Sequence, residues 1–201
     1  MQRLSDITLI AQVVTFGSER AFEQLVRAHQ EVVRRFLCRL TAGDEMRADD
    51  LAQETFIRAW QGLSSFRQLS GFETWLLKIA YRVFLDDRRK TPSPLPLKGE
   101  SSHSQELIST QKHSTLPLEG ERGGSLGESE SESFSLRHDL DLALSTLSET
   151  ERTCVVLQCV EGQSIKEIAQ ITGMNENTVK SHLLRGKKNL AEYLRKNGYG
   201  D

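Results

Sequence analysis

The sequence lacks any long run of apolar side chains. No stretch approaches the roughly 18 consecutive apolar residues that a membrane-spanning helix needs, and the opening residues contain no basic segment followed by an apolar one. A signal peptide is therefore not predicted. We expect a cytoplasmic protein with no direct membrane insertion.

Cysteine is also scarce, and the residues that usually carry catalysis are not grouped. The three cysteines are Cys38, Cys154 and Cys159. This odd number, without a CxxC pair, favours reduced thiols in the core over disulfides or a metal site. No glycine-rich phosphate loop and no nucleophile–base constellation is present. We therefore expect no catalytic residues, no metal, no cofactor and no enzymatic activity.

The chain has no large excess of charge of either sign, since its formal net charge is −2. Residues 1–90 contain 14 basic and 12 acidic side chains, residues 91–136 contain 3 and 7, and residues 137–201 contain 9 and 9. Any affinity for nucleic acid must therefore come from local basic faces and not from the total charge.

One segment differs from the rest in composition. Residues 91–136 are rich in Ser, Glu, Gly and Pro, and all four prolines of the chain fall within 92–117. The segment contains a near-repeat (LPLKGE and LPLEGE) and an acidic serine run at 127–133. Such a composition predicts a disordered linker at 91–136 between helical domains at 1–90 and 137–196.

Apolar spacing predicts four helices in the first domain. The first ends near Phe16, the second follows a cap at Ser18, the third runs from about Asp49 to Leu63, and the fourth begins at Phe72 after a loop at 64–71. His29 falls within the apolar stripe of the second helix, so we expect it to be packed rather than catalytic.

Two surfaces of this domain have distinctive side chains. The third helix carries a stripe of Gln and carboxylates, which is typical of a solvent-facing side but also suits a protein-docking surface. Aromatic and basic residues interleave between Phe66 and Lys90, a pattern found where proteins bind unpaired bases. The alternative is that these aromatics form the core. We expect that for Phe72, and the pattern leaves Trp75 open.

The last part of the chain has the pattern of a helix-turn-helix. Capping boxes are predicted at Ser148–Glu151 and Ser164–Glu167, and Gly173 falls where a turn needs a left-handed residue. The helix that follows Asn175 holds six Lys or Arg and two Glu between 176 and 196. This surplus suits a helix in the major groove, although an ordinary amphipathic helix with a solvated basic face would look similar.

Both domains together resemble a bacterial RNA polymerase sigma factor of the extracytoplasmic-function (ECF) group, in the sigma-70 family. DDLAQETFIRAWQGLSSF at 49–66 is similar to the family's polymerase-docking region, and GFETWLLKIAYRVFLDDRRK at 71–90 to the part that melts and captures the minus-ten element. LSETERTCVVLQCVEGQSIKEIAQITGMNENTVKSHLLRGKKNL at 147–190 is similar to the domain that recognises the minus-thirty-five element. The signature of the first domain precedes that of the second, as it does in the family.

The resemblance implies an all-α fold of two small helical domains, a four-helix region 2 and a helix-turn-helix region 4, joined by the long linker. It implies polymerase contacts by Asp50, Gln53, Glu54, Arg58 and Trp60. It implies minus-ten contacts by Phe66, Arg67 and the 68–73 loop, and the interleaved pattern adds Trp75, Lys78, Arg82 and Arg89 as minus-ten candidates. It implies minus-thirty-five contacts by Glu176, Asn177, Lys180, Ser181, Leu184, Arg185 and Lys188. The implied partners are the clamp helices and flap of RNA polymerase core, promoter DNA and an anti-sigma factor.

The sequence departs from the family pattern at one informative place. Where the family usually has Arg-Asn on the fourth helix, this chain has Tyr81-Arg82, which predicts an altered base preference at the minus-ten element. The long acidic linker is a second departure. A different hypothesis is an independent helix-turn-helix regulator whose N-terminal domain senses a ligand or dimerises, and a sensor pocket within 1–90 would distinguish it. An enzyme is the more remote alternative.

Overall fold

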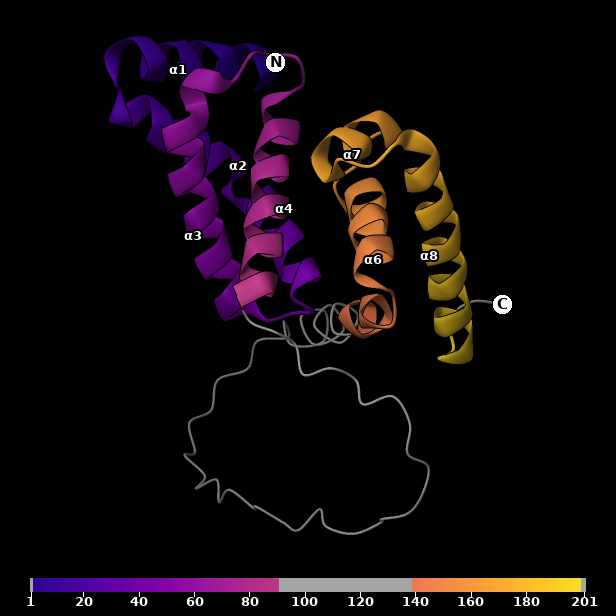
Figure 1. Cartoon of the computed structure of the whole chain (residues 1–201). Helices are drawn as coiled ribbons and strands as arrows, with labels where there is room; N and C mark the ends of the chain where they lie inside the picture. Colours follow the sequence, from indigo (N-terminus) through magenta and orange to yellow (C-terminus); the bar gives the residue numbers. More distant parts are fainter. Residues whose placement is uncertain (1, 91–138, 200–201) are drawn as a thin grey trace, which may run out of the picture.

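The computed structural model describes residues 2–90 and 139–199, and both segments are built from helices without a strand (Figure 1). The all-α fold expected from the sequence is confirmed. The predicted linker at 91–136 and the first two residues of the predicted second domain lie outside the described residues.

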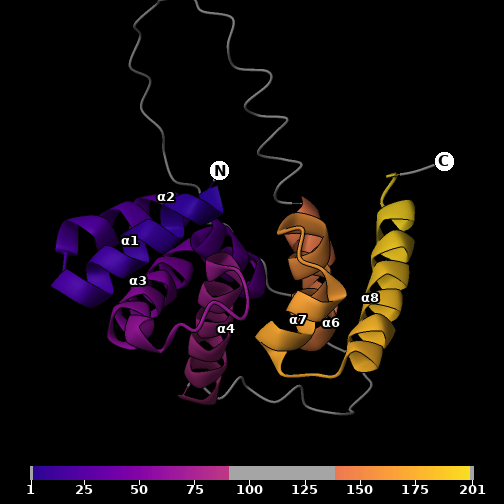
Figure 2. The same ribbon diagram turned by 90° about the horizontal axis from the view of Figure 1, so that it is seen from above.

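The N-terminal half contains four helices and one short turn of 3-10 helix. They are α1 (Gln2–Phe16), α2 (Glu19–Leu40), α3 (Glu45–Gly62), η1 (Leu63–Ser65) and α4 (Phe72–Lys90). Helices α2, α3 and α4 pack against one another, and α1 lies across their end, on α2 and η1 (Figures 1 and 2).

Helix α3 begins four residues before the predicted start at Asp49. The side chain of Asp44 accepts a hydrogen bond from the backbone N–H of Arg47 at 3.0 Å, so it caps an additional turn. Ala48 in that turn is fully buried. The prediction was wrong because it took the acidic pair at 49–50 as the helix start, and the cap is the earlier aspartate.

The C-terminal half contains a helical stretch at 139–145 and four named elements. These are α6 (Glu149–Val155), the short π-helix η2 (Val156–Val160), α7 (Ile165–Thr172) and α8 (Glu176–Lys196). Both predicted capping boxes are present. Gly173 ends α7 with φ of +77°, as a left-handed turn residue should.

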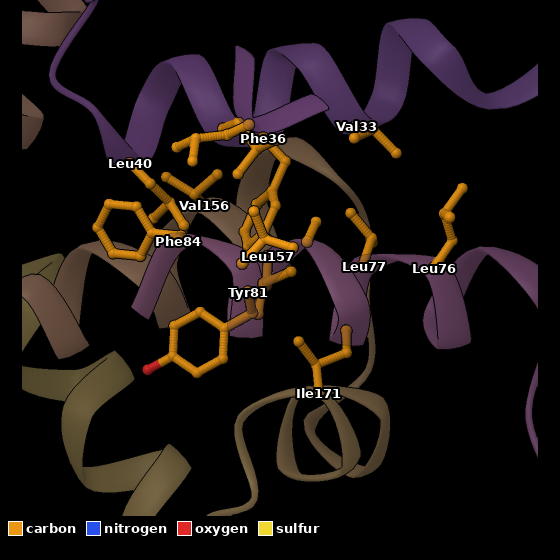
Figure 3. Packing of buried hydrophobic residues seen from close by; sticks show 14 of the residues in the cluster. Val33, Phe36, Leu40, Leu76, Leu77, Tyr81, Phe84, Val156, Leu157 and Ile171 are labelled. Carbon is orange, nitrogen blue, oxygen red and sulfur yellow. The ribbon is translucent and has the colours of Figure 1, made fainter. Parts of the chain in front are cut away.

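The two halves are packed together and share one hydrophobic core. Figure 3 shows side chains of α2 (Phe36) and α4 (Leu77, Tyr81) meeting Leu157 of η2 and Ile171 of α7. The C-terminal half lies beside α4, with α8 on its far side (Figure 2). A description of two domains on a tether predicted no such contact, so this junction is a finding of the structure.

The cysteines only partly follow the expectation of core thiols. Cys154 is fully buried, and burial raises the pKa of its thiol to about 11. Cys38 is half-buried, whereas Cys159 is exposed, so the expectation was wrong for Cys159. Cys159 lies in the wider η2, where the helical phase differs from that of the preceding α-helix.

Candidate nucleic-acid and protein interfaces

The loop before α4 and the first two turns of α4 enclose a pocket with a volume of about 320 Å³. Four of the predicted minus-ten residues line it together: Phe66, Arg67, Trp75 and Lys78. Gln170, from α7 of the other half, also lines it. The pocket thus combines aromatic faces with two cations, which is the combination that holds an unpaired nucleotide.

The aromatic side of this pocket is a packed cluster of three rings. Trp75 stacks on Phe72 with ring centroids 5.6 Å apart and an interplanar angle of 28°. Phe66 meets Trp75 at 5.4 Å and the edge of Phe72 at 5.7 Å. Phe72 is buried, as predicted. Trp75 is half-buried because one side packs on Phe72 while it also lines the pocket.

The two remaining minus-ten candidates do not line the pocket. Arg82 and Arg89 are exposed further along α4. At about 100° per residue they share the helix face of Trp75 and Lys78, so they extend the pocket as a basic track. Arg89 also lies 3.7 Å from the carboxylate of Asp86.

The predicted docking stripe lies on α3. Asp50 and Gln53 are exposed, while Glu54 and Arg58 are joined in an ion pair at 2.7 Å. A second Arg58 nitrogen lies 2.7 Å from Asp86 of α4. This hydrogen bond from Arg58 lowers the pKa of Asp86 below its ordinary value. Arg58 therefore ties the stripe to α4 as well as lying on it.

Two large apolar side chains accompany this stripe. Trp60, a predicted docking residue, is exposed at one side and makes an edge contact with Phe22 of α2 at 4.9 Å. Ile57 is 52% exposed, one turn beyond Gln53. Sequence analysis did not select Ile57, and an isolated apolar residue within a polar stripe was the only available signal.

The minus-thirty-five candidates form one open surface on α8. Asn175 caps the helix by accepting from the N–H of Thr178 at 2.8 Å. Leu184 is 75% exposed, so it lies outside the core. The other six candidates are also exposed: Glu176, Asn177, Lys180, Ser181, Arg185 and Lys188.

Arg185 stands at the margin of this surface. Counted at about 100° per residue, Asn177, Ser181 and Leu184 form its centre, and Arg185 lies toward one edge. The Nε atom of Arg185 is 3.9 Å from the carboxylate of Glu151 on α6. This position suits a contact with the DNA backbone better than one with a base edge.

Gly186, on the buried side of α8, is a structural residue that sequence analysis missed. It lies where α8 crosses α6 so closely that an added Cβ would be 2.8 Å from Cγ2 of Val155. The same Cβ would be 3.4 Å from the backbone oxygen of Glu151. The missing side chain therefore sets the distance of α8 from α6.

Polar contacts complete the junction between the halves. Gln163, in the turn before α7, donates to Glu73 at 2.9 Å and accepts from the hydroxyl of Thr74 at 3.2 Å. Arg35 of α2 donates to Glu161 at 3.0 Å. Arg39 also pairs with Asp141. Because the partners are about a hundred residues apart in the chain, local sequence patterns gave no signal for these pairs.

Tyr81 belongs to this junction. Its side chain is buried, with 8% exposure, and burial raises the pKa of its hydroxyl. Glu149 and Cys154 of α6 add to that shift. The departure from the family's Arg-Asn pair therefore places an aromatic ring under the C-terminal half.

Within 2–90 and 139–199 no group of His, Cys, Asp and Glu side chains has the arrangement of a metal site. In the same part of the chain, no helix is both long enough and apolar enough to cross a membrane.

Comparison with known proteins gives a consistent result for both halves. Residues 25–92 match Sigma-70 region 2, and residues 137–190 match Sigma-70, region 4. The chain is 30% identical over 179 residues to the ECF RNA polymerase sigma factor SigW of Bacillus subtilis (strain 168), covering 89% of this chain and 91% of that protein. The chain therefore belongs to the ECF sigma factors of the sigma-70 family.

Two solved structures have the same fold over most of the chain. The sigma factor RpoE, solved with the anti-sigma factor NepR from Bartonella quintana, is 26% identical with a TM-score of 0.62, covering 87% of this chain and 96% of its own. CnrH, solved with the cytosolic domain of CnrY, is 23% identical with a TM-score of 0.65, covering 96% and 99%. The second likeness concerns the fold alone.

Family membership establishes the general function. The chain binds RNA polymerase and promoter DNA, and it directs promoter-specific transcription initiation. The hypothesis of an independent helix-turn-helix regulator is therefore wrong, since residues 25–92 belong to Sigma-70 region 2 and not to a ligand sensor.

Proposed function

We propose that the pocket between the 66–71 loop and α4 captures an unpaired base of the minus-ten element. The observation that carries this proposal is the convergence of Phe66, Arg67, Trp75 and Lys78 on one pocket of about 320 Å³. The aromatic rings supply stacking, worth about 1–3 kcal/mol per base. The cations hold the adjoining phosphates, and Arg82 and Arg89 continue this contact along α4.

A base in this pocket must first leave the duplex, so the pocket selects for melted DNA. Promoter opening is then driven by the free energy of binding unstacked bases, without nucleotide hydrolysis. We propose accordingly that the chain is not itself an enzyme. Because polymerase and DNA are its partners, we propose that it acts in the cytoplasm.

The polymerase contacts are assigned to the α3 stripe. Asp50, Gln53, Glu54 and Arg58 offer hydrogen-bonding groups to the clamp helices, and Trp60 offers an apolar edge. We assign a contact with the flap to region 4, from 137 to 196, and assign residues 1–90 to region 2 and 91–136 to a linker.

The minus-thirty-five contacts are assigned to the open surface of α8. Its centre is formed by Asn177, Ser181 and Leu184, which face the bases when the helix enters the major groove. Lys180 and Lys188 are point charges suited to phosphates, and Glu176 lies at the helix start.

An anti-sigma factor is the further partner that we propose. The support comes from the relative RpoE, which was solved with the anti-sigma factor NepR and shares the fold over 87% of this chain. The packed junction between the two halves gives such a partner a single compact surface to bind.

Transcription with purified polymerase core tests the capture pocket. We expect wild-type protein to support run-off transcription from a promoter library, and Trp75→Ala to lower it at least about tenfold through loss of stacking. On a template already melted at the start site the loss should be smaller. Equal transcription by Trp75→Ala and wild type on duplex templates would exclude the pocket.

A pair of charge reversals tests the docking stripe. Glu54→Lys and Glu23→Lys each break an i,i+4 ion pair with an arginine, Arg58 and Arg27 respectively. Each should cost only about 0.5 kcal/mol of folding stability. We expect only Glu54→Lys to weaken binding to core. Similar core affinities of the two variants would remove Glu54 from the interface.

A further inference from the structure

A buried polar pair lies directly beneath the aromatic cluster. Asp6 of α1 and His29 of α2 are only 6% and 3% exposed, and Nε2 of His29 is 3.2 Å from Oδ2 of Asp6. Because an ionised carboxylate can only accept, the imidazole Nε2–H donates in this hydrogen bond. The predicted packing of His29 is confirmed, but the pattern gave no indication of a buried partner.

Burying the Asp6–His29 pair costs folding free energy. Removing a carboxylate from water disfavours folding unless its hydrogen bonds replace the lost hydration, and the Nδ1 atom of His29 is buried without a hydrogen-bond partner. Leucine-sized residues would fill the same space without these penalties. The pair therefore calls for an explanation other than stability.

The ring of His29 contacts the cluster that forms the pocket. His29 meets Phe72 edge to face, with centroids 5.1 Å apart and an interplanar angle of 71°. Phe72 in turn stacks on Trp75. The chain of contacts thus runs from α1 through Asp6 and His29 to the ring that lines the pocket.

The loop that completes the pocket needs such support. Backbone hydrogen bonds anchor it at its two ends, from Phe66 N–H to Leu63 and from Trp75 N–H to Gly71. Between them Gln68 has a φ of +56°, a conformation that a residue other than glycine adopts at a cost. Asp6 and the loop also line one cavity of about 390 Å³.

We propose that Asp6 and His29 are positioning residues for minus-ten capture. Asp6 fixes the tilt of the His29 ring, the ring fixes Phe72, and Phe72 holds Trp75 at the angle that keeps the pocket open. The inference rests on the capture function proposed above. It makes α1 part of the base-capturing apparatus, although no predicted DNA contact lies on α1.

The test measures binding of holoenzyme to single-stranded promoter DNA. The probe is the minus-ten strand of a promoter that the holoenzyme transcribes, intact or with one abasic position scanned along it. In wild type, the abasic position that weakens binding marks the captured base. We expect His29→Gln, which keeps a donor but loses the ring, to weaken intact-strand binding about fivefold or more, and to leave binding to that abasic strand unchanged.

Variants of Asp6 separate geometry from charge. Asp6→Ala frees the ring and should weaken capture like His29→Gln. Asp6→Asn retains an acceptor for Nε2–H and should restore capture to within about twofold of wild type. Val13→Ala removes buried methyl groups from α1 without touching the pair, so it should lower the melting temperature but leave the intact-to-abasic ratio unchanged.

Two results would overturn the proposal alone. One is that His29→Gln weakens binding to the intact and abasic strands equally, or weakens binding to core in parallel. Either outcome would indicate a general folding defect. The other is wild-type capture in both His29→Gln and Asp6→Ala. If wild-type holoenzyme itself binds every abasic strand as tightly as the intact one, the capture pocket fails, and the positioning role fails with it.

Discussion

The two surfaces that we propose contact DNA differ in how the fold presents them. The minus-ten pocket lies at the junction of the halves, where Gln170 of α7 forms part of its lining. The recognition surface of α8 lies on the far side of the C-terminal half, and Leu184 at its centre is 75% exposed. The packed arrangement therefore leaves the α8 surface open, while the C-terminal half forms part of the pocket wall through Gln170.

This difference indicates what has to change before both promoter elements are bound. The α8 candidates are already exposed, so we expect no rearrangement before they meet a major groove. We expect a base to enter the proposed pocket more freely once α7 moves away from α4, which would break the contacts of Gln163 with Glu73 and Thr74. Polymerase, whose proposed contacts include both halves, is suited to drive this separation.

The largest effect is expected from placing a charge in the junction. Tyr81→Arg would bury a cation beneath α6, and even with Glu149 nearby the lost hydration should cost about 3 kcal/mol if the halves stayed together. We therefore expect the halves to separate, which small-angle scattering would detect as a larger radius of gyration. The free chain should then bind single-stranded minus-ten DNA more tightly, with upstream binding unchanged.

Tyr81→Phe is the matched control for this prediction. It keeps the ring and removes only the hydroxyl, so both the radius and the strand affinity should stay close to wild type. If Tyr81→Arg enlarges the molecule without improving strand binding, the C-terminal half does not restrict the pocket, and the two surfaces are equally accessible.

The second prediction concerns the other surface, on α8. Gly186→Ala would place a methyl group 2.8 Å from Val155 and close to the backbone of Glu151. We expect α8 to shift and the C-terminal half to lose about 1–3 kcal/mol of stability. Upstream binding should weaken, whereas capture by the pocket should not. Urea unfolding measures the change in stability. Binding to upstream duplex DNA and to single-stranded minus-ten DNA measures the two effects on DNA binding.

Asn189→Ala, on the exposed side of α8 near Gly186, provides the comparison for that experiment. It adds no buried atom and should change stability by less than about 0.5 kcal/mol. Unchanged unfolding of Gly186→Ala would mean that α6 and α8 have room to separate without cost.

Sequence patterns were sufficient for the local features on which these predictions depend. The capping boxes at Ser148 and Ser164 and the turn at Gly173 are determined by neighbours within a few residues, so short spacings reveal them. The apolar period likewise identified the packed position of His29. For the pocket, the family resemblance selected Phe66 and Arg67, and the interleaving of aromatic and basic residues selected Trp75 and Lys78.

The remaining features depend on contacts between distant parts of the chain. Arg35 and Glu161 are 126 positions apart, and nothing near either residue indicates the other. The sequence shows that Tyr81 departs from the family pattern. Only the fold shows that its ring is covered by α6. A single sequence predicts which faces are apolar, but it does not show which distant residues cover them.

The third prediction sharpens the description of the open surface. Asn177 lies at the centre of the α8 face, and an amide can pair with an adenine edge. Asn177→Ala should cost about 1–3 kcal/mol on the preferred upstream element and relax the preference at one position. Arg185 lies at the edge, so Arg185→Ala should weaken binding to all sequences alike. It should also lower the slope of log affinity against log salt concentration by about one. Binding of holoenzyme to matched and mismatched duplexes across salt concentrations separates these outcomes. A loss confined to one base pair in Arg185→Ala would reverse the two assignments.

The smallest expected effect concerns Glu73, which accepts the hydrogen bond from Gln163 across the junction. Burial raises the pKa of this carboxyl above its ordinary value. The folded state therefore binds the proton more tightly than the unfolded state, so the ionised form opposes folding at neutral pH. Its penalty should disappear as the pH falls through the raised pKa. Other charges modulate the shift: His29, Glu161, Arg35 and Glu167.

Glu73→Gln keeps an oxygen that can accept from Gln163 and removes the charge. We expect it to stabilise the packed form at pH 7 by less than about 1 kcal/mol, because Glu73 is only half-buried and solvent screens its charge. The advantage over wild type should shrink as the pH is lowered through the raised pKa of the wild-type carboxyl. Urea unfolding of both proteins at pH 7 and pH 5 measures this, with Glu23→Gln on the exposed side of α2 as the control. A stability difference that stays constant between the two pH values would show that the charge of Glu73 does not oppose the packing of region 4 on region 2.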